Sequence, residues 1–242
     1  MGLRLSREYL VFDGRQSTDF GVWISGSGTF NAPERDMDTV SVPGRNGDLT
    51  FDNGRYKNLN VTYPAFISRD FCQHVEDFRS FLMSKIGYKR LEDTYHPDEY
   101  RMAMYAGSFS VRPAPRNIAG AFDLTFNCKP QRFLKAGEIP RAITANSAVM
   151  YNPTSFRARP LIRVYGTGNF TIAGINLVIV SQAGAYMDID TELMDAFYGS
   201  VNCNSRITLT NGEFPVLEPG ESEITKTSGI TRLEITPRWW RL

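Results

Sequence analysis

Short apolar runs alternate with polar positions along almost the whole chain. The runs are rich in Val, Ile, Thr, Phe and Tyr and are bounded by Gly, Asn, Pro and Asp, which is typical of β-strands joined by turns. Clear examples are Leu59–Phe66, Tyr105–Val111, Phe122–Cys128, Leu161–Gly166, Asn176–Ser181 and Leu233–Pro237. Regular short strands with turn signals between them predict a mainly β protein made of sandwiches or barrels.

One segment has the helical period instead. Apolar residues recur there at spacings of three or four, at Phe71, Val75, Phe78, Leu82 and Ile86. This stripe predicts one α-helix over Asp70–Ile86, with Ser68 as its N-cap and Gly87 as the left-handed residue after its end. Cys72 and His74 lie on this helix two positions apart, so they are not expected to act as a pair.

A change in composition predicts two domains. The apolar strand before "CKPQRFLKAG" (Cys128–Gly137) gives way to a loop rich in Asn, Pro and small residues. We therefore expect an α+β domain over residues 1–135, which holds the helix, and an all-β domain over 136–242. The second domain has 242 − 135 = 107 residues, close to the roughly 100 residues of one β-sandwich. Its short connections leave no room for an arm longer than about 25 residues.

A glycine-rich stretch near the start predicts a hairpin. "GRNGDLTFDNG" (Gly44–Gly54) lacks the Gly-Lys-Ser/Thr of a phosphate loop and no helix follows it. It favours a long hairpin over Val42–Asn58 with Asn-Gly turns. Such a hairpin could be an ordinary exposed one, or it could extend a sheet of a neighbouring subunit.

Composition narrows the function classes only slightly. The chain has 242 residues, of which 42% are hydrophobic and 22% charged, and its net charge is +1. No overall field therefore attracts nucleic acid or an anionic membrane. No targeting or membrane-spanning segment is evident, so folding in a cytoplasm is expected. Three widely spaced cysteines (Cys72, Cys128 and Cys203) make a disulfide framework or a zinc site an unfavourable interpretation.

The search for catalytic chemistry finds one candidate stretch. "DTYHPDEYR" (Asp93–Arg101) holds acidic residues around one of only two histidines, and could bind a metal or act as an acid–base group. The residues concerned are Asp93, His96, Asp98 and Glu99. A tight turn is the favoured alternative, because Pro97 disfavours the helical conformation at His96. We therefore assign no catalytic, cofactor-binding or metal-ligating residue, and we expect neither a cofactor nor enzymatic activity.

The adjacent tryptophans near the end of the chain are a further unusual feature. On a strand, Trp239 and Trp240 would point to opposite faces. One is expected to close the core, and the other to contact a partner, solvent or a sugar.

Five segments, taken in order, resemble one known family. They are "FDGRQSTDFGVWISGSGTFNAPERDMDTVSVPGRNGDL" (Phe12–Leu49), "LEDTYHPDEYRMA" (Leu91–Ala103), "AFDLTFNCKPQRFLKAG" (Ala121–Gly137), "NPTSFRARPLIRVYGTGN" (Asn152–Asn169) and the ending from "FPVLEPGESEI" to "LEITPRWWRL" (Phe214–Leu242). Together they cover almost the whole chain. The series resembles the distal tail proteins of long, flexible-tailed (siphovirus-type) bacteriophages and prophages.

The resemblance implies a structural virion protein of the phage tail tip, assembled in the host cytoplasm. The N-terminal domain would build a hexameric ring that joins the tail tube to the tip or baseplate and leaves a channel for DNA. The C-terminal domain would be a galectin-like or carbohydrate-module-like β-sandwich. The implied partners are further copies of the chain, the tail tube protein, the tape-measure protein and tail-associated or baseplate proteins. DNA would pass without specific binding, and no membrane is involved.

Two other functions stay open at this point. A carbohydrate-binding protein that recognises host glycans would need aromatic residues grouped beside Asp, Asn and Arg on one sheet face, and Trp239, Trp240 and Tyr198 are the candidates. A small hydrolase would centre on His96 and its acidic neighbours.

The two-domain interpretation predicts the outcome of limited proteolysis. Proteases cut at exposed segments of this kind, here the strand-to-loop change at Pro130–Gly137 and the small, polar stretch Ala142–Asn152. We expect two fragments near 15 and 12 kDa, at about 0.11 kDa per residue, as for two independently packed domains. Gel electrophoresis with mass spectrometry measures this, and cuts scattered through Leu161–Ile235 would contradict it.

Overall fold

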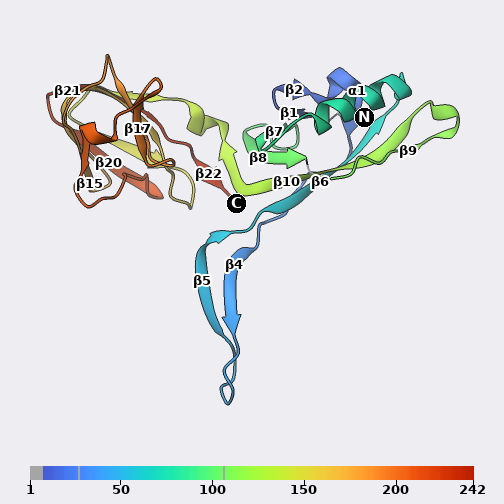
Figure 1. Cartoon of the computed structure of the whole chain (residues 1–242), viewed down its shortest axis with the longest axis horizontal. Helices are drawn as coiled ribbons and strands as arrows, with labels where there is room; N and C mark the ends of the chain where they lie inside the picture. Colours follow the sequence, from blue (N-terminus) through green and yellow to red (C-terminus); the bar gives the residue numbers. More distant parts are fainter. Residues whose placement is uncertain (1–7, 27, 106) are drawn as a thin grey trace, which may run out of the picture. The chain divides into compact units, whose positions relative to one another are not determined.

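The fold is mainly β, with one α-helix among the described residues, and the chain divides into two compact units. The computed structural model describes residues 8–26, 28–105 and 107–242. One unit runs to Arg132 and includes Leu242, and the other spans Phe133–Arg241 (Figure 1). The domain boundary predicted from the sequence lies after residue 135. The division falls earlier because Leu134 packs against the core of the second unit and donates its N–H to the Trp239 carbonyl there (2.8 Å).

A single sheet forms the body of the first unit. Its strand order is β2-β1-β7-β8-β10-β6-β3, and β9 pairs with β10. The bounds are β1 Leu10–Phe12, β2 Arg15–Gln16, β3 Val22–Ile24, β6 Leu59–Ile67, β7 Lys89–Asp93, β8 Glu99–Tyr105, β9 Arg112–Pro113 and β10 Gly120–Leu134. Short 3₁₀ turns lie at Ser17–Phe20 and Pro115–Asn117.

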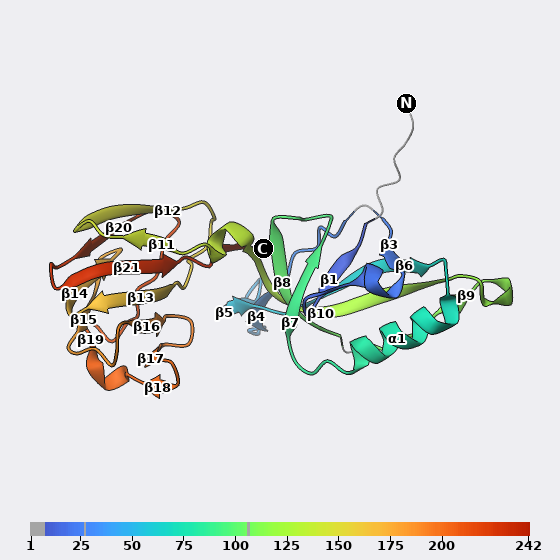
Figure 2. The same cartoon turned by 90° about the horizontal axis from the view of Figure 1, so that it is seen from above.

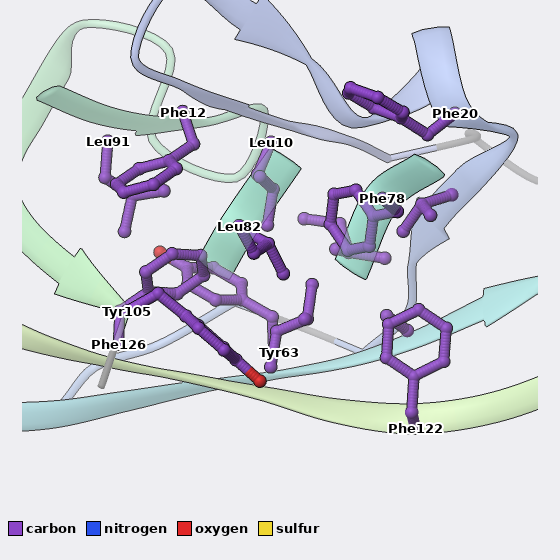
Figure 3. Close-up of a cluster of buried hydrophobic side chains, with 14 of the residues drawn as sticks. Leu10, Phe12, Phe20, Tyr63, Phe78, Leu82, Leu91, Tyr105, Phe122 and Phe126 are labelled. Atoms are coloured by element: carbon purple, nitrogen blue, oxygen red, sulfur yellow. The ribbon is translucent and has the colours of Figure 1, made fainter. Parts of the chain in front are cut away.

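Strict alternation builds the core of this unit. Along β6 and the first half of β10, every second side chain is buried, and these two strands pair antiparallel in register. Aromatic residues dominate the buried side, and Figure 3 shows their rings gathered between the sheet and the helix. They include Phe12, Phe20, Tyr63, Phe78, Tyr105, Phe122 and Phe126. Ring centroids 5.0–6.2 Å apart, in tilted, stacked and edge-on pairs, fill this space densely.

The predicted helix is present but shorter than expected. Helix α1 spans Phe71–Met83, and its buried residues are Phe71, Phe78 and Leu82 (Figure 2). The N-cap is Asp70 in a left-handed conformation, so the assignment of Ser68 to that position is wrong. Ile86 lies beyond the helix and is 89% exposed. The helix ends early because the chain must return to the sheet, where β7 begins at Lys89.

The hairpin is also present, with a different partner strand. β4 (Arg35–Val40) pairs antiparallel with β5 (Leu49–Tyr56), and the tip lies between them at residues 41–48. Asn53-Gly54 was expected to turn the chain, but both residues lie within β5. The strand register shifts between Arg35 and Met37, opposite that segment. Gly54 therefore lies at a bulge-like irregularity of the β4–β5 pairing and not at a turn.

The second unit is a sandwich of two sheets (Figure 2). One sheet has the order β11-β21-β13-β16-β17-β18 and the other β12-β20-β14-β15-β19. The bounds are β11 Arg141–Ile143, β12 Ser147–Asn152, β13 Leu161–Gly166, β14 Gly168–Ile172, β15 Ile175–Ile179, β16 Met187–Asp190, β17 Asp195–Tyr198, β18 Val201–Asn202, β19 Ile207–Leu209, β20 Gly220–Lys226 and β21 Ile230–Thr236. A final strand, β22 (Trp240–Arg241), follows the sandwich.

Aliphatic side chains from both sheets form the core of the sandwich. They come from alternate positions of the strands, as in Ile162 and Val164 of β13 and Leu233 and Ile235 of β21. The longest connection, residues 210–219 between β19 and β20, is shorter than the arm length considered above, so the expectation of a compact lobe is confirmed. Among the described residues, no helix has the length and apolarity needed to span a membrane.

The aromatic core gives a direct stability prediction. Phe78 is fully buried and packs against Phe20, Phe109 and Phe122. Phe78→Ala should lower the free energy of unfolding of the first unit by about 3–5 kcal/mol, because transfer and cavity terms add. Urea denaturation followed by helix circular dichroism measures this. The matched control is Ile86→Ala, which should change stability by less than about 0.5 kcal/mol.

Candidate functional site

The β4–β5 hairpin exposes apolar side chains that the rest of the described chain leaves uncovered. Asp38 lies opposite Phe51 and Val40 opposite Leu49, so Val40, Leu49 and Phe51 share one face. Phe51 is 57% exposed, and Val40 and Met37 are each 48% exposed. Within the described residues, the hairpin is a two-stranded sheet of its own, with both outer edges unpaired (Figure 1).

Polar cross-strand links hold the two strands in register. Arg55 binds Asp36 (2.6 Å) and Arg35 donates through Nε to Asp52 (2.7 Å). The bond from Arg35 holds the pKa of the Asp52 carboxyl below its ordinary value. These contacts are solvent-exposed and therefore weak. Because an isolated two-stranded hairpin is marginally stable in water, this element needs further strands or a partner surface.

The root of the hairpin is held more firmly. β6 begins at Leu59, directly after the hairpin, and Asn58 donates its side-chain N–H to Asn127 of β10 (2.8 Å). Tyr88 donates its hydroxyl to the same Asn127 oxygen (3.1 Å). Three segments far apart in the sequence thus meet where the hairpin leaves the sheet.

The stretch around His96 folds as a turn. The Asp93 carboxylate accepts the His96 backbone N–H (2.8 Å) through one oxygen and the Tyr63 hydroxyl (2.7 Å) through the other. Burial, and then the neighbouring Asp93 charge, raise the pKa of Tyr63 well above its ordinary value. Of the four candidate residues, Asp93, His96 and Glu99 line one cavity, whereas Asp98 is exposed and does not.

That cavity is too small for an organic substrate. Its volume is ≈ 10 Å³, about the size of one water molecule. Sequence reasoning missed the two arginines that join it, Arg101 and Arg132. Glu99 and Arg101 occupy alternate positions of β8, on the same side as the buried Ala103 and Tyr105. This alternation is the signal that could have predicted a buried position for Arg101. Within the described residues, no group of three or more His, Cys, Asp or Glu side chains is arranged to hold a metal ion.

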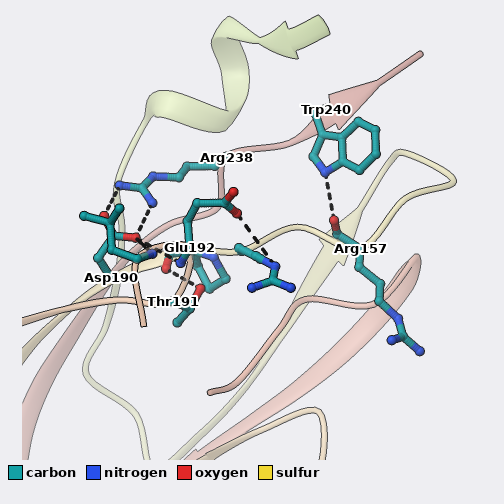
Figure 4. A network of polar contacts seen from close by, with 9 residues as sticks. Arg157, Asp190, Thr191, Glu192, Arg238 and Trp240 are labelled. Atoms are coloured by element: carbon teal, nitrogen blue, oxygen red, sulfur yellow. Dashed lines mark hydrogen bonds and ion pairs between the residues drawn. The ribbon is translucent and has the colours of Figure 1, made fainter. Parts of the chain in front are cut away.

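The two tryptophans have separate roles within the second unit. Trp239 is buried in the sandwich core, as expected for one of the pair. Trp240 is half-buried, stacks on Phe156 (4.5 Å between centroids) and donates its indole N–H to the Arg157 carbonyl (2.8 Å) (Figure 4). The carbohydrate-binding alternative required Trp239, Trp240 and Tyr198 to group on one exposed sheet face, and the burial of Trp239 in the core does not meet that requirement.

Another group of aromatic residues lies beside the six-stranded sheet, and one of its members, Tyr198, also packs against the sandwich core. Tyr165, Tyr186 and Tyr198 lie with ring centroids 5.1–6.0 Å apart. Arg163 covers the ring of Tyr186 (4.0 Å) and Arg232 that of Tyr165 (4.1 Å). A sugar stacks on an open aromatic face, and these two rings already bear guanidinium groups, so this face does not favour the carbohydrate-binding alternative.

Charged residues tie the end of the second unit to its β16–β17 turn. Arg238 makes two parallel bonds (2.8 Å each) to the carboxylate of Asp190, which also accepts the Glu192 N–H (3.0 Å) (Figure 4). Burial works to raise the pKa of Asp190, but these hydrogen bonds outweigh it and hold the pKa below its ordinary value. Such a forked pair fixes geometry as well as adding energy.

Comparison with solved structures identifies the class of fold. The chain resembles the crystal structure of the Dit (gp 19.1) protein of SPP1, described as a paradigm of the hub adsorption apparatus in phages that infect Gram-positive bacteria. The TM-score is 0.75 at 13% sequence identity, over 97% of this chain and 99% of that one. No protein-family model matches the sequence, and no curated protein does. The resemblance to distal tail proteins is thus confirmed at the level of the fold.

The Asp190–Arg238 pair generates a pH prediction. The folded pKa of Asp190 lies below its ordinary value of 3.8, so its stabilisation is full above about that pH and is lost as the pH falls through the folded value. Asp190→Asn should lower the free energy of unfolding by about 1.5–3 kcal/mol at neutral pH, the range for hydrogen bonds to charged groups.

Denaturation across pH 2–7 tests this, and the gap between wild type and Asp190→Asn should narrow below pH 3.8. Glu218→Gln, which removes an exposed partner of Arg157, is the control and should behave as wild type at every pH. A gap that is constant over the whole range would contradict the assignment.

Proposed function

We propose that this protein is a structural component of a phage tail tip, a distal tail protein that serves as the hub of the adsorption apparatus. The likeness to the SPP1 Dit fold over nearly both entire chains supports this role. The five sequence segments described above resemble distal tail proteins and support the same role.

The β4–β5 hairpin is the observation that carries the assembly part of the proposal. It presents two unpaired edges and one exposed apolar face. A two-stranded hairpin of this kind is only marginally stable alone in water. A neighbouring copy would cover Phe51 and its neighbours and add strands to the hairpin. Repetition of one such head-to-tail contact closes a ring when the rotation between neighbouring copies is a whole fraction of a full turn. The number of subunits, six, comes from the family resemblance.

The remaining parts of the proposal come from the family resemblance. The ring would join the tail tube to the tip or baseplate and leave a channel through which DNA passes. Its partners would be the tail tube protein, the tape-measure protein and tail-associated or baseplate proteins, and it would be assembled in the host cytoplasm. The protein acts without catalysis, because the one candidate acid–base group encloses a cavity of only ≈ 10 Å³ and its Asp93 carboxylate binds the turn.

Imaging of the purified protein tests the ring. Negative-stain electron microscopy with mass measurement in solution should give closed rings for the wild type. Phe51→Glu should give subunits that no longer close, because a carboxylate cannot be buried against the neighbouring copy without a partner.

The matched control is Leu193→Glu. Leu193 is 71% exposed on the second unit, so this variant makes the same kind of change outside the hairpin and should keep the ring. A wild-type protein that is monomeric at micromolar concentration, or a Phe51→Glu variant that still forms rings, would contradict the proposed assembly.

A further inference from the structure

A small polar cavity lies inside the first unit, where two arginines that sequence reasoning missed join Asp93 and Glu99. Glu99 and Arg101 point inward from β8, Asp93 ends β7, and Arg132 comes from the second half of β10. Arg101 is 6% exposed and Glu99 4% exposed. A charged group this deeply buried is costly unless hydrogen bonds replace its lost hydration.

Two buried hydrogen-bond donors at this cavity lack an acceptor in the described part of the chain. The buried Arg101 Nη1 and Arg132 Nε find no acceptor among the described residues. Asp93 is already engaged, since its oxygens accept His96 and Tyr63. Arg132 forms an ion pair with Glu99 through Nη1, which lies 3.4 Å from Oε2. These two donors therefore require an acceptor, and both arginines line the same cavity, which could hold it.

Charge and volume limit what that acceptor is. The two guanidinium groups of Arg101 and Arg132 are balanced by the two carboxylates of Asp93 and Glu99, so an added anion would bring an unbalanced buried charge. A cavity of ≈ 10 Å³ holds about one small molecule of water size.

We propose that this cavity is a binding site for a single ordered water molecule. The water accepts hydrogen bonds from Arg101 Nη1 and Arg132 Nε and donates toward the Glu99 carboxylate, which gives it the two to four polar partners that buried waters have. It thereby links β8 to β10 at Arg132, where the first unit ends.

A crystal structure of the full chain at about 1.5 Å tests the site, grown once with chloride and once with bromide as the sole halide. We expect one density peak in both crystals, at about 2.7–3.2 Å from Arg101 Nη1 and Arg132 Nε, without anomalous signal at the bromine edge. An anomalous peak there would replace water by a bound anion. Direct bonds from Arg101 to Glu99 or Asp93, with no peak between them, would also overturn the proposal.

Variants then separate this site from ordinary surface water. Arg101→Met fills similar space without donors, so the peak should disappear from its crystals. Arg112→Met removes an arginine whose side chain is 75% exposed on β9, and it should leave the peak unchanged. A peak of full occupancy in Arg101→Met would show that Arg101 does not bind the water. The wild-type crystals decide the main question even if Arg101→Met does not fold.

Discussion

The antiparallel pairing of β10 with β6 is the contact on which the first unit depends. It runs without a break from Gly120 opposite Ile67 to Cys128 opposite Leu59. Because side chains alternate along a strand, one register places Phe122, Leu124 and Phe126 together on the buried side. A slip by one residue would turn that aromatic surface to solvent. The β4–β5 hairpin directly precedes β6 in the chain, and α1 follows it, so the position of β6 in the sheet also places these two elements.

The hairpin takes its orientation from this pairing but not its stability. Asn58, which joins the hairpin to β6, is hydrogen-bonded to Asn127 of β10, so this end of the hairpin is fixed to the sheet. The rest of the hairpin has only exposed ion pairs and an uncovered Phe51, so its stability depends on contact with another surface. Assembly and folding would therefore be linked. An element that is marginal in one subunit gains its stabilisation when a second subunit buries it.

Polar groups inside each unit hold turns in place. Asp93 holds the His96 turn, and Asp190 holds Arg238 together with the β16–β17 turn. Burial raises the pKa of Cys128 to about 12, so this thiol stays protonated and unreactive. The shifted pKa values of the buried groups Tyr63, Asp190 and Cys128 arise from burial and from hydrogen bonds at structural positions, and this alternative must be weighed whenever such shifts suggest an active site.

The sequence alone determined the parts of the fold that depend on local periodicity. Alternating burial in β6 and β10, the single helix around Phe78 and the all-β second half follow from the spacing of apolar residues. Tertiary structure decided what depends on contacts between distant segments. It ended the helix before Ile86, paired β5 with β4, and stacked Trp240 on Phe156. It also gathered Asp93, Glu99, Arg101 and Arg132 around one cavity. Periodicity tells which side of an element is buried, but only the pairing of strands remote in sequence determines which side chains meet there.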